Sequence, residues 1–272
     1  MPKYTEEKTE YEGFERLRRK KTVRHIKRRV FTAVLLVFLC VVFFVLTLGV
    51  FFRISEISVN GNDVYNDQDI IESSGIAYGS NIYLLDTAEV SATLKREFPY
   101  IKRVKIERDI PQKIVLNLEC DVAVYYVEIC GEYFAVSRDL RVLERAEELE
   151  TLTGKYPEIK KLLTTDVEEA VVGKTMVFTR ANYYEAVKAF LGLLESTECF
   201  DGLTTVDVSD RFSINLIHNH RIKASIGDPT DAELKLRFLH EVLKDLGDQS
   251  ATVDVENVEM AYVILTNGET YD

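Results

Sequence analysis

The chain has 272 residues and a formal net charge of −11 at pH 7, from 34 Lys or Arg against 45 Asp or Glu. The charge is segregated, because residues 1–30 carry 11 basic and 5 acidic side chains whereas the remainder carries 23 and 40. An acidic body of this size excludes nucleic acid as its expected ligand, since the phosphate backbone binds basic surfaces.

The element that organises the chain is an uncharged apolar stretch at residues 31–52. As a helix it spans roughly 33 Å, which matches the roughly 30 Å hydrocarbon core of a bilayer. A cleaved signal peptide has a shorter apolar region of about 7–15 residues and a small-residue cleavage site after it. This stretch is longer, and Phe51-Phe52-Arg53 stands at its end with no such cleavage site. The sequence therefore predicts a retained transmembrane helix.

The flanks of the span predict its orientation. Residues 14–30 contain nine basic side chains against one acid, Glu15. Basic residues beside a membrane span stay in the cytoplasm. We therefore expect a cytoplasmic tail at residues 1–30 and an extracytoplasmic body after Arg53. The basic residues are Arg16, Arg18, Arg19, Lys20, Lys21, Arg24, Lys27, Arg28 and Arg29.

Residues 53–120 predict a first domain with the order strand, helix, helix, strand, strand. Two helices are expected at 67–74 and 88–98, each preceded by Asp or Asn side chains that can cap the first turn. Alternating apolar residues predict strands at 54–59, 103–107 and 114–118. The expected core of this domain is Val59, Ile70, Leu94, Val104, Ile106, Leu116 and Leu118.

Residues 121–266 predict a second domain, a mixed β-sheet with flanking helices, followed by a short tail at 267–272. One helix is expected from a stripe of apolar residues at 184–194, and another from a capping box of Thr230 and Glu233 to Gly247. Residues 144–178 have no clear pattern apart from one turn. Strands and a few helices in this arrangement predict an α+β fold. The expected strands are 122–127, 133–137, 142–143, 204–208, 212–218, 221–226, 252–255 and 258–266.

The first domain also carries a set of short motifs. They are Val59-Asn60-Gly61-Asn62, Ser74-Gly75-Ile76 with Gly79 and Asn81, Phe98-Pro99-Tyr100-Ile101, and Arg108 with Pro111 and Glu119. This set resembles the POTRA domain of the bacterial cell-division proteins FtsQ and DivIB. In the second domain, Ile226-Gly227, Lys235-Leu236 and Val253-Asp254 are similar to that family too, whereas residues 147–180 match its pattern weakly. The match does not distinguish the FtsQ branch from the DivIB branch.

The resemblance implies a non-enzymatic scaffold of the division machinery, concentrated at the division septum. Its implied partners are small membrane proteins of the FtsL and FtsB/DivIC types and the septal peptidoglycan synthases FtsW and FtsI. One alternative is a membrane-anchored cell-envelope hydrolase or transferase with an atypical site. Another is a POTRA chaperone of outer-membrane proteins, but such chains carry several POTRA units and a long barrel region.

Few side chains suggest chemistry, and we expect no catalytic residue, cofactor or metal. His218 and His220 could share a face at a strand end, yet no third metal ligand is evident. Asp207 and Asp210 form a carboxylate pair that more simply makes a turn. Cys120 and Cys130 could pair across a hairpin, which the sequence leaves open.

The closing segment, residues 258–265, is apolar on both faces and contains one charge, Glu259. A central strand covered on both sides would explain this pattern. A strand at a sheet edge would explain it equally if a partner covers it. In the resembling family, this end of the second domain receives a strand from the FtsB/DivIC-type partner. We therefore expect strand addition here, through Val258, Met260, Tyr262, Val263 and Ile264.

Overall fold

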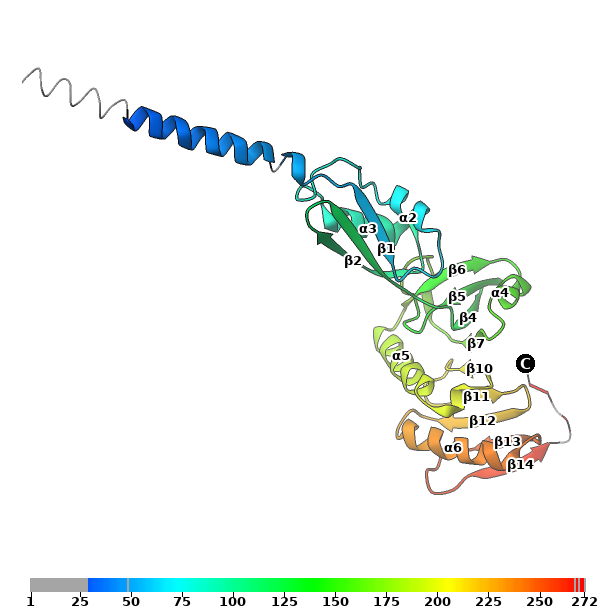
Figure 1. Ribbon diagram of the computed structural model, residues 1–272. Helices are drawn as coiled ribbons and strands as arrows, with labels where there is room; N and C mark the ends of the chain where they lie inside the picture. Colours follow the sequence, from blue (N-terminus) through cyan, green and yellow to red (C-terminus); the bar gives the residue numbers. More distant parts are fainter. Residues whose placement is uncertain (1–28, 48, 267, 269, 272) are drawn as a thin grey trace, which may run out of the picture. The chain divides into compact units, whose positions relative to one another are not determined.

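The computed structural model describes residues 29–47, 49–266, 268 and 270–271 (Figure 1). Apart from its last two residues, the predicted basic tail therefore lies outside the described residues. By its internal contacts the chain divides into two compact units. The first holds the described residues up to Ser58 together with Ile76–Leu85 and Glu107–Val115, and the second holds Val59–Gly75, Asp86–Ile106 and the chain from Leu116 onward. The predicted domain boundaries stay predictions.

An apolar helix, Arg29–Phe51, opens the described chain, with a mean hydropathy of 3.2 in its most apolar window. None of that window is buried against other parts of the protein. Its 23 residues span roughly 35 Å at about 1.5 Å per residue. By length and composition it is a candidate transmembrane helix, close to the predicted one.

The strand β1 (Glu56–Asn60) begins a three-stranded sheet with the order β1-β3-β2, in which β2 is Ile101–Asp109 and β3 is Lys113–Cys120. Two helices, α2 (Asp67–Ser73) and α3 (Thr87–Glu97), precede β2. Asn66 caps α2 by accepting a hydrogen bond from the amide of Gln68, and Asp86 caps α3 in the same way. The order β-α-α-β-β agrees with the prediction.

The core of this sheet is centred on β3. Ile114, Leu116 and Leu118 are buried on this central strand, and Ile70 of α2 and Leu94 of α3 are buried as well. Three residues predicted for the core are only half-buried, because they lie on the outer strands, where one neighbour is missing. They are Val59 on β1 and Val104 and Ile106 on β2.

A nine-stranded mixed sheet follows, with the strand order β14-β13-β12-β11-β10-β7-β4-β5-β6. The parallel strand β7 joins the antiparallel ladder β4-β5-β6 to the ladder β10-β11-β12. Its strands are β4 (Tyr125–Ile129), β5 (Glu132–Val136), β6 (Val142–Ala146), β7 (Lys160–Leu163), β10 (Leu203–Asp207), β11 (Ile214–His218), β12 (Ile222–Gly227), β13 (Ser250–Asp254) and β14 (Tyr262–Thr266).

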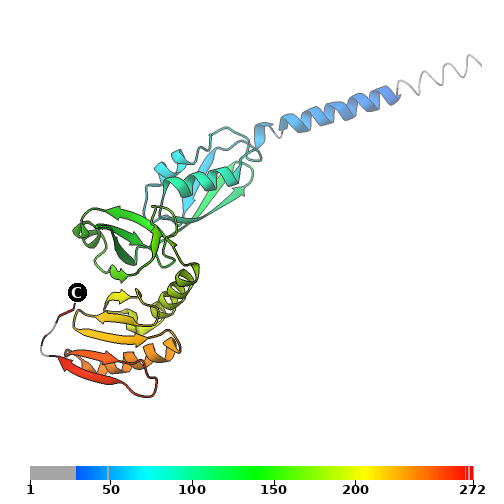
Figure 2. The same cartoon turned by 180° about the vertical axis from the view of Figure 1, so that it is seen from behind.

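Helices cover both faces of this sheet in part. The helices α5 (Ala181–Glu195) and α6 (Ala232–Leu246) share the larger core with the strands, and α6 lies against β12 and β13 in both views (Figures 1 and 2). The short helix α4 (Leu149–Lys155) packs Leu152 on the opposite face. The alternation along β4 agrees, because Tyr125 belongs to the larger core and Tyr126 to the smaller one.

Two local predictions were wrong or incomplete. The segment 144–178, which had no clear pattern, contains α4, β7 and the small pair β8 (Val167–Glu169) and β9 (Val177–Phe178). The capping box at the start of α6 does not form, since the residue before the helix is Asp231 at φ 52° and it makes no side-chain cap. The amide of Thr230 instead donates to Asp228 Oδ1 at 2.7 Å.

Candidate functional site

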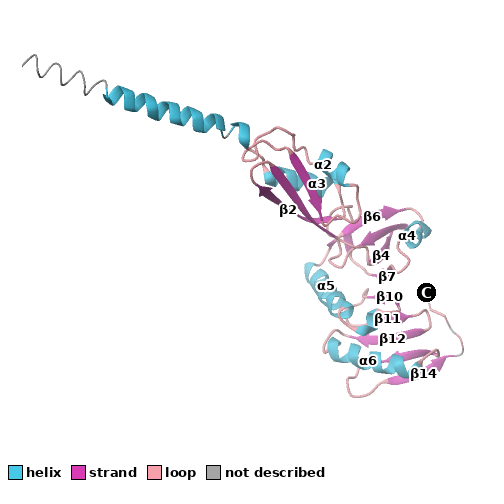
Figure 3. Ribbon diagram, in the orientation of Figure 1, coloured by secondary structure: helices cyan, strands magenta, loops and turns pink. Residues whose placement is uncertain are grey.

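The last strand, β14, lies at the edge of the nine-stranded sheet (Figure 3). It pairs antiparallel with β13, from Asp254 opposite Tyr262 to Ser250 opposite Thr266. On its other side, β13 pairs in parallel with β12. Within the part of the chain that the structure describes, β13 is therefore the one strand that pairs with β14. An edge strand presents a row of backbone N–H and C=O groups that another chain can pair with.

The side chains of β14 are apolar and exposed. The exposed fractions are 65% for Ile264, 60% for Leu265, 59% for Tyr262 and 42% for Val263, and the strand has no charge. The neighbouring strand β13 is not exposed in this way, since its Val253 is fully buried. Natural sheets usually protect an edge with charge, Pro, a bulge or a covering element. The strand β14 itself carries neither charge nor Pro.

The pairing register assigns the side chains to faces, because directly paired residues lie on the same side of a sheet. Val263 pairs with Val253, whose side chain belongs to the core shared with α5 and α6. Ile264 pairs with Thr252 on the other face. There the chain end returns, and Tyr271 Oη lies 3.1 Å from Thr252 Oγ1.

Two of the residues predicted to lie on this strand, Val258 and Met260, lie before it. The strand begins only at Tyr262, because Asn257 holds a turn in which its Oδ1 accepts from the amide of Glu259 at 2.9 Å. Met260 is 51% exposed and extends the apolar surface of β14 along the chain. Val258 is half-buried and lines a pocket beside α6.

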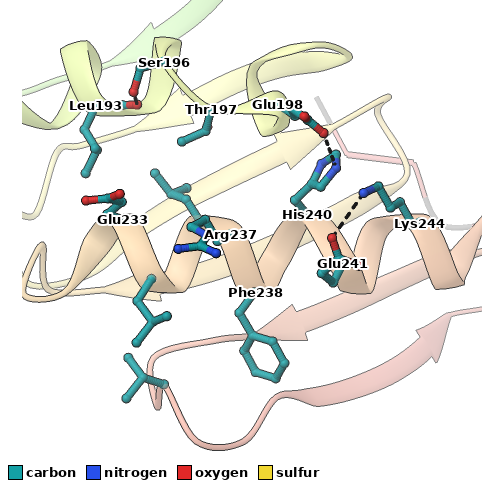
Figure 4. A pocket seen from close by; sticks show the side chains of 13 residues that line it. Leu193, Ser196, Thr197, Glu198, Glu233, Arg237, Phe238, His240, Glu241 and Lys244 are labelled. Carbon is teal, nitrogen blue, oxygen red and sulfur yellow. Dashed lines mark hydrogen bonds and ion pairs between the residues drawn. The ribbon is translucent and has the colours of Figure 1, made fainter.

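That pocket measures about 550 Å³ and lies between α6 and the end of α5 (Figure 4). Its walls combine apolar side chains, such as Phe238, with ion pairs. His240 Nε2 lies 2.7 Å from Glu198 Oε2, and Lys244 Nζ lies 3.1 Å from Glu241 Oε1. These polar pairs line the pocket beside its apolar side chains, and they do not form a nucleophile and base pair.

The side chains weighed for chemistry hold the backbone instead. His218 Nε2 lies 2.7 Å from the carbonyl of Asp201, and burial lowers the pKa of this histidine. His220 Nδ1 lies 3.2 Å from a different carbonyl, that of Tyr271. Asp207 Oδ1 accepts from the amide of Ser209 at 3.0 Å, which makes the expected turn. Among the described residues, no group of three His, Cys, Asp or Glu could hold a metal ion.

The cysteines that could have paired are free thiols. Cys120 is half-buried at the end of β3, and Cys130 is exposed at the tip of the β4–β5 hairpin. Burial raises the pKa of the Cys120 thiol, which disfavours its thiolate form.

Sequence reasoning gave no role to Lys235, which is 4% exposed in the first turns of α6. Its Nζ donates to the carbonyls of Ile226 at 3.1 Å and Asp228 at 2.9 Å. The side chain thus ties the end of β12 to α6, the helix that flanks the edge strands. The only signal for it in the sequence was the Lys-Leu step of the family resemblance.

The motifs of the first domain also have structural roles. Gly61 has φ +73°, and a Cβ at this position would lie 2.2 Å from the carbonyl oxygen of Leu118, so only glycine fits. Arg108 donates through Nε to the carbonyl of Ile82 at 3.0 Å and through its guanidinium to that of Leu85 at 3.1 Å. These contacts hold the loop that precedes α3 in a fixed conformation.

Comparison with known proteins agrees with these observations. Residues 52–119 match the family model of the FtsQ-type POTRA domain. The chain is 25% identical to the cell division protein DivIB of Clostridium botulinum (strain Hall) over 226 residues, which covers 83% of this chain and 84% of that protein. It is 26% identical to DivIB of Clostridium tetani over 193 residues, 71% of this chain and 70% of that protein. A shorter match, 33% over 66 residues and about a quarter of each chain, links it to the cell division protein FtsQ of Streptomyces coelicolor.

The domain order, the motif positions and these similarities agree on one assignment. The matched POTRA segment coincides with the β-α-α-β-β sheet, and the DivIB similarity extends well beyond it into the second sheet. The chain thus carries a segment that matches the FtsQ-type POTRA domain, and over most of its length it is similar to cell-division proteins named DivIB.

Proposed function

We propose that this protein is a non-enzymatic scaffold of cell division, anchored by the apolar helix Arg29–Phe51. It binds FtsL-type and FtsB/DivIC-type partners outside the membrane and links them to septal peptidoglycan synthesis by FtsW and FtsI. The similarity to DivIB proteins supports the role in cell division. The single observation that carries the binding role is the uncovered edge strand β14.

Strand addition suits this edge for a physical reason. A partner segment that pairs with β14 gains backbone hydrogen bonds along the open side, which supply affinity without a particular sequence. The side chains on the two faces then supply selectivity. Tyr262 and Ile264 project from the face of Thr252, whereas Val263 projects from the face covered by the helices. A partner that alternates apolar residues can cover both rows.

Met260 and Val258, which were predicted to bind the partner but lie outside β14, are consistent with the same proposal. Met260 is exposed next to the strand, so it extends the apolar surface that a partner would cover. Val258 joins the strand surface to the pocket beside α6. A partner segment longer than the five residues of β14 would meet both.

The orientation of the anchor is part of the proposal. The nine basic residues between 14 and 30 support a cytoplasmic N-terminus and an extracytoplasmic body. Concentration at the septum is proposed from the similarity to DivIB proteins. A reporter that is active only outside the cytoplasm should be active when fused after Asp272 and inactive when inserted at Gly13. The opposite result would exclude partner binding outside the membrane.

The binding role is tested by capture of the extracytoplasmic segment of the DivIC-type partner from the same organism. Ile264→Asp places a charge on the exposed strand, and we expect it to weaken binding at least tenfold, or about 1.4 kcal/mol. Phe212→Asp is the matched control, because Phe212 is 64% exposed at another surface. Circular dichroism must show that both variants keep the fold. Equal binding by both variants would place the partner site elsewhere.

A pair of proline variants separates backbone pairing from side-chain contact. Neighbouring amides of a strand point to opposite sides, so Val263→Pro and Ile264→Pro remove donors on opposite sides of β14. One of them breaks a hydrogen bond to β13, and the other removes only an outward donor. We expect the variant that stays folded to lose partner binding. Full binding by that variant would mean that the partner does not extend the sheet.

A further inference from the structure

A second exposed apolar surface lies at the other end of the described chain. The ten residues Ile76–Leu85, between α2 and α3, contain no charged side chain. Three of them are exposed although they are large and apolar or aromatic: Leu84 at 84%, Tyr78 at 59% and Tyr83 at 52%. Three large apolar or aromatic side chains exposed within one short loop point to an interaction site. We call these ten residues the apolar loop.

The apolar loop is attached to the residues that follow the apolar helix (Figure 3). The amide of Ile82 donates to the carbonyl of Phe52 at 2.9 Å, and the amide of Gly79 donates to that of Ile54 at 2.7 Å. The rings of Phe52 and Tyr83 lie 5.2 Å apart between centroids. The apolar loop therefore lies next to the residues that directly follow the helix, within the same compact unit.

The backbone of the apolar loop is held firmly, so the exposure of its side chains is built into the fold. Arg108 fixes the carbonyls of Ile82 and Leu85, and Asn81 Oδ1 accepts from the amide of Tyr83 at 2.9 Å. The turn between β2 and β3 lies at the same end, since Gln112 Nε2 donates to the carbonyl of Phe51 at 3.4 Å. In this turn Ile110 is 54% exposed.

Tyrosine and leucine in this position fit the surface of a lipid bilayer. Tyrosine is enriched where the hydrocarbon meets the headgroups, because its ring is apolar and its hydroxyl is polar. An apolar side chain such as Leu84 gains by entering the acyl boundary. The absence of charge on the loop removes the main cost of doing so.

We propose that the apolar loop inserts Tyr78, Tyr83 and Leu84 into the headgroup region of the membrane that the helix crosses. This inference rests on the membrane anchor of the proposed function. Lipid is favoured over a protein partner because the loop is bonded to Phe52 and Ile54, directly after the helix, so it reaches the membrane surface wherever the helix leaves it. The first unit is then held to the bilayer at two places instead of one.

The chain contains no Trp, so a single introduced indole reports its own surroundings. Full-length Tyr83→Trp is reconstituted in vesicles of phosphatidylethanolamine and phosphatidylglycerol, in which part of the lipid is brominated high on its acyl chains. Tyr262→Trp on β14 is the reference, with a native side chain of similar exposure. We expect quenching of Tyr83→Trp to be at least about twofold stronger, because apolar groups that bind in the interface lie roughly 5–10 Å deep, at the boundary of headgroups and acyl chains.

Two further variants make the outcome decisive. Phe51→Trp, at the end of the apolar helix, tests the anchor itself. If Phe51→Trp is quenched and Tyr83→Trp matches Tyr262→Trp, the loop does not enter lipid and is left for a protein partner, while the anchor stands. If Phe51→Trp is not quenched, the anchor fails and the proposed function with it. Adding Leu84→Glu to Tyr83→Trp should reduce the quenching, and full quenching in that double variant would also contradict the insertion.

Discussion

Leu116→Ala tests whether β3 is the centre of the first sheet. The Leu116 side chain is fully buried in the middle of β3. The substitution removes three carbon groups at roughly 0.8 kcal/mol each, or about 2.4 kcal/mol, before any cavity is counted. Large-to-small changes at such sites cost about 2–5 kcal/mol with the cavity included. We expect the free energy of unfolding to fall by about 3 kcal/mol.

The matched control is Ile106→Ala, which deletes a side chain of the same volume on the outer strand β2. Because Ile106 is only half-buried, about half the transfer free energy is lost, or roughly 1 kcal/mol. Urea unfolding of residues 53–272 is followed by the fluorescence of Tyr83→Trp, since the chain has no Trp of its own. An equal or smaller loss for Leu116→Ala would show that β3 does not occupy the centre.

Two other variants test the polar contacts. Lys235→Met keeps the packing but leaves the carbonyls of Ile226 and Asp228 without their donor. The free energy of unfolding in urea should therefore fall by about 1–3 kcal/mol. A fall no larger than that caused by Lys244→Met, at an exposed lysine, would contradict the role of Lys235. Asp139 accepts from Lys102, and this hydrogen bond holds the pKa of the Asp139 carboxyl below its ordinary value. Its contribution to stability is therefore present above the unfolded pKa and is lost as pH falls through the folded one. Stability should thus drop less for Asp139→Asn than for the parent when pH falls below about 4, and equal drops would mean that this carboxylate adds nothing.

Several features followed from the sequence because local chemistry specifies them. An uncharged stretch of this length has few alternatives to a membrane helix. Asn66 and Asp86 cap the helices of the first domain as expected, since capping depends on residues two or three positions away. The motif Val59-Asn60-Gly61-Asn62 carried part of the family resemblance, and the structure adds that Gly61 is needed for the close approach of this segment to β3.

Other predictions failed where a neighbouring side chain competes for the same group, or where the pattern is too short to be recognised. The capping box of Thr230 and Glu233 has the right spacing. The Thr230 amide donates to Asp228, however, and the helix begins only after Asp231. The strands β7, β8 and β9 have only four, three and two residues. Patterns so short cannot show a period, so only their partners in the sheet define them.

The edge strand β14 shows most clearly the difference between what local sequence specifies and what the whole fold specifies. The sequence by itself determined that the closing segment is apolar on both faces, a pattern that suits a central strand and an uncovered edge equally. Only the tertiary structure decided between them, because edge position depends on pairing with β13 alone and on the order of all nine strands. Tyr262 and Ile264 would be core residues if a further strand and a covering layer lay beside them. They are exposed because the sheet ends there, and that is a property of the whole fold which no stretch of the chain encodes locally.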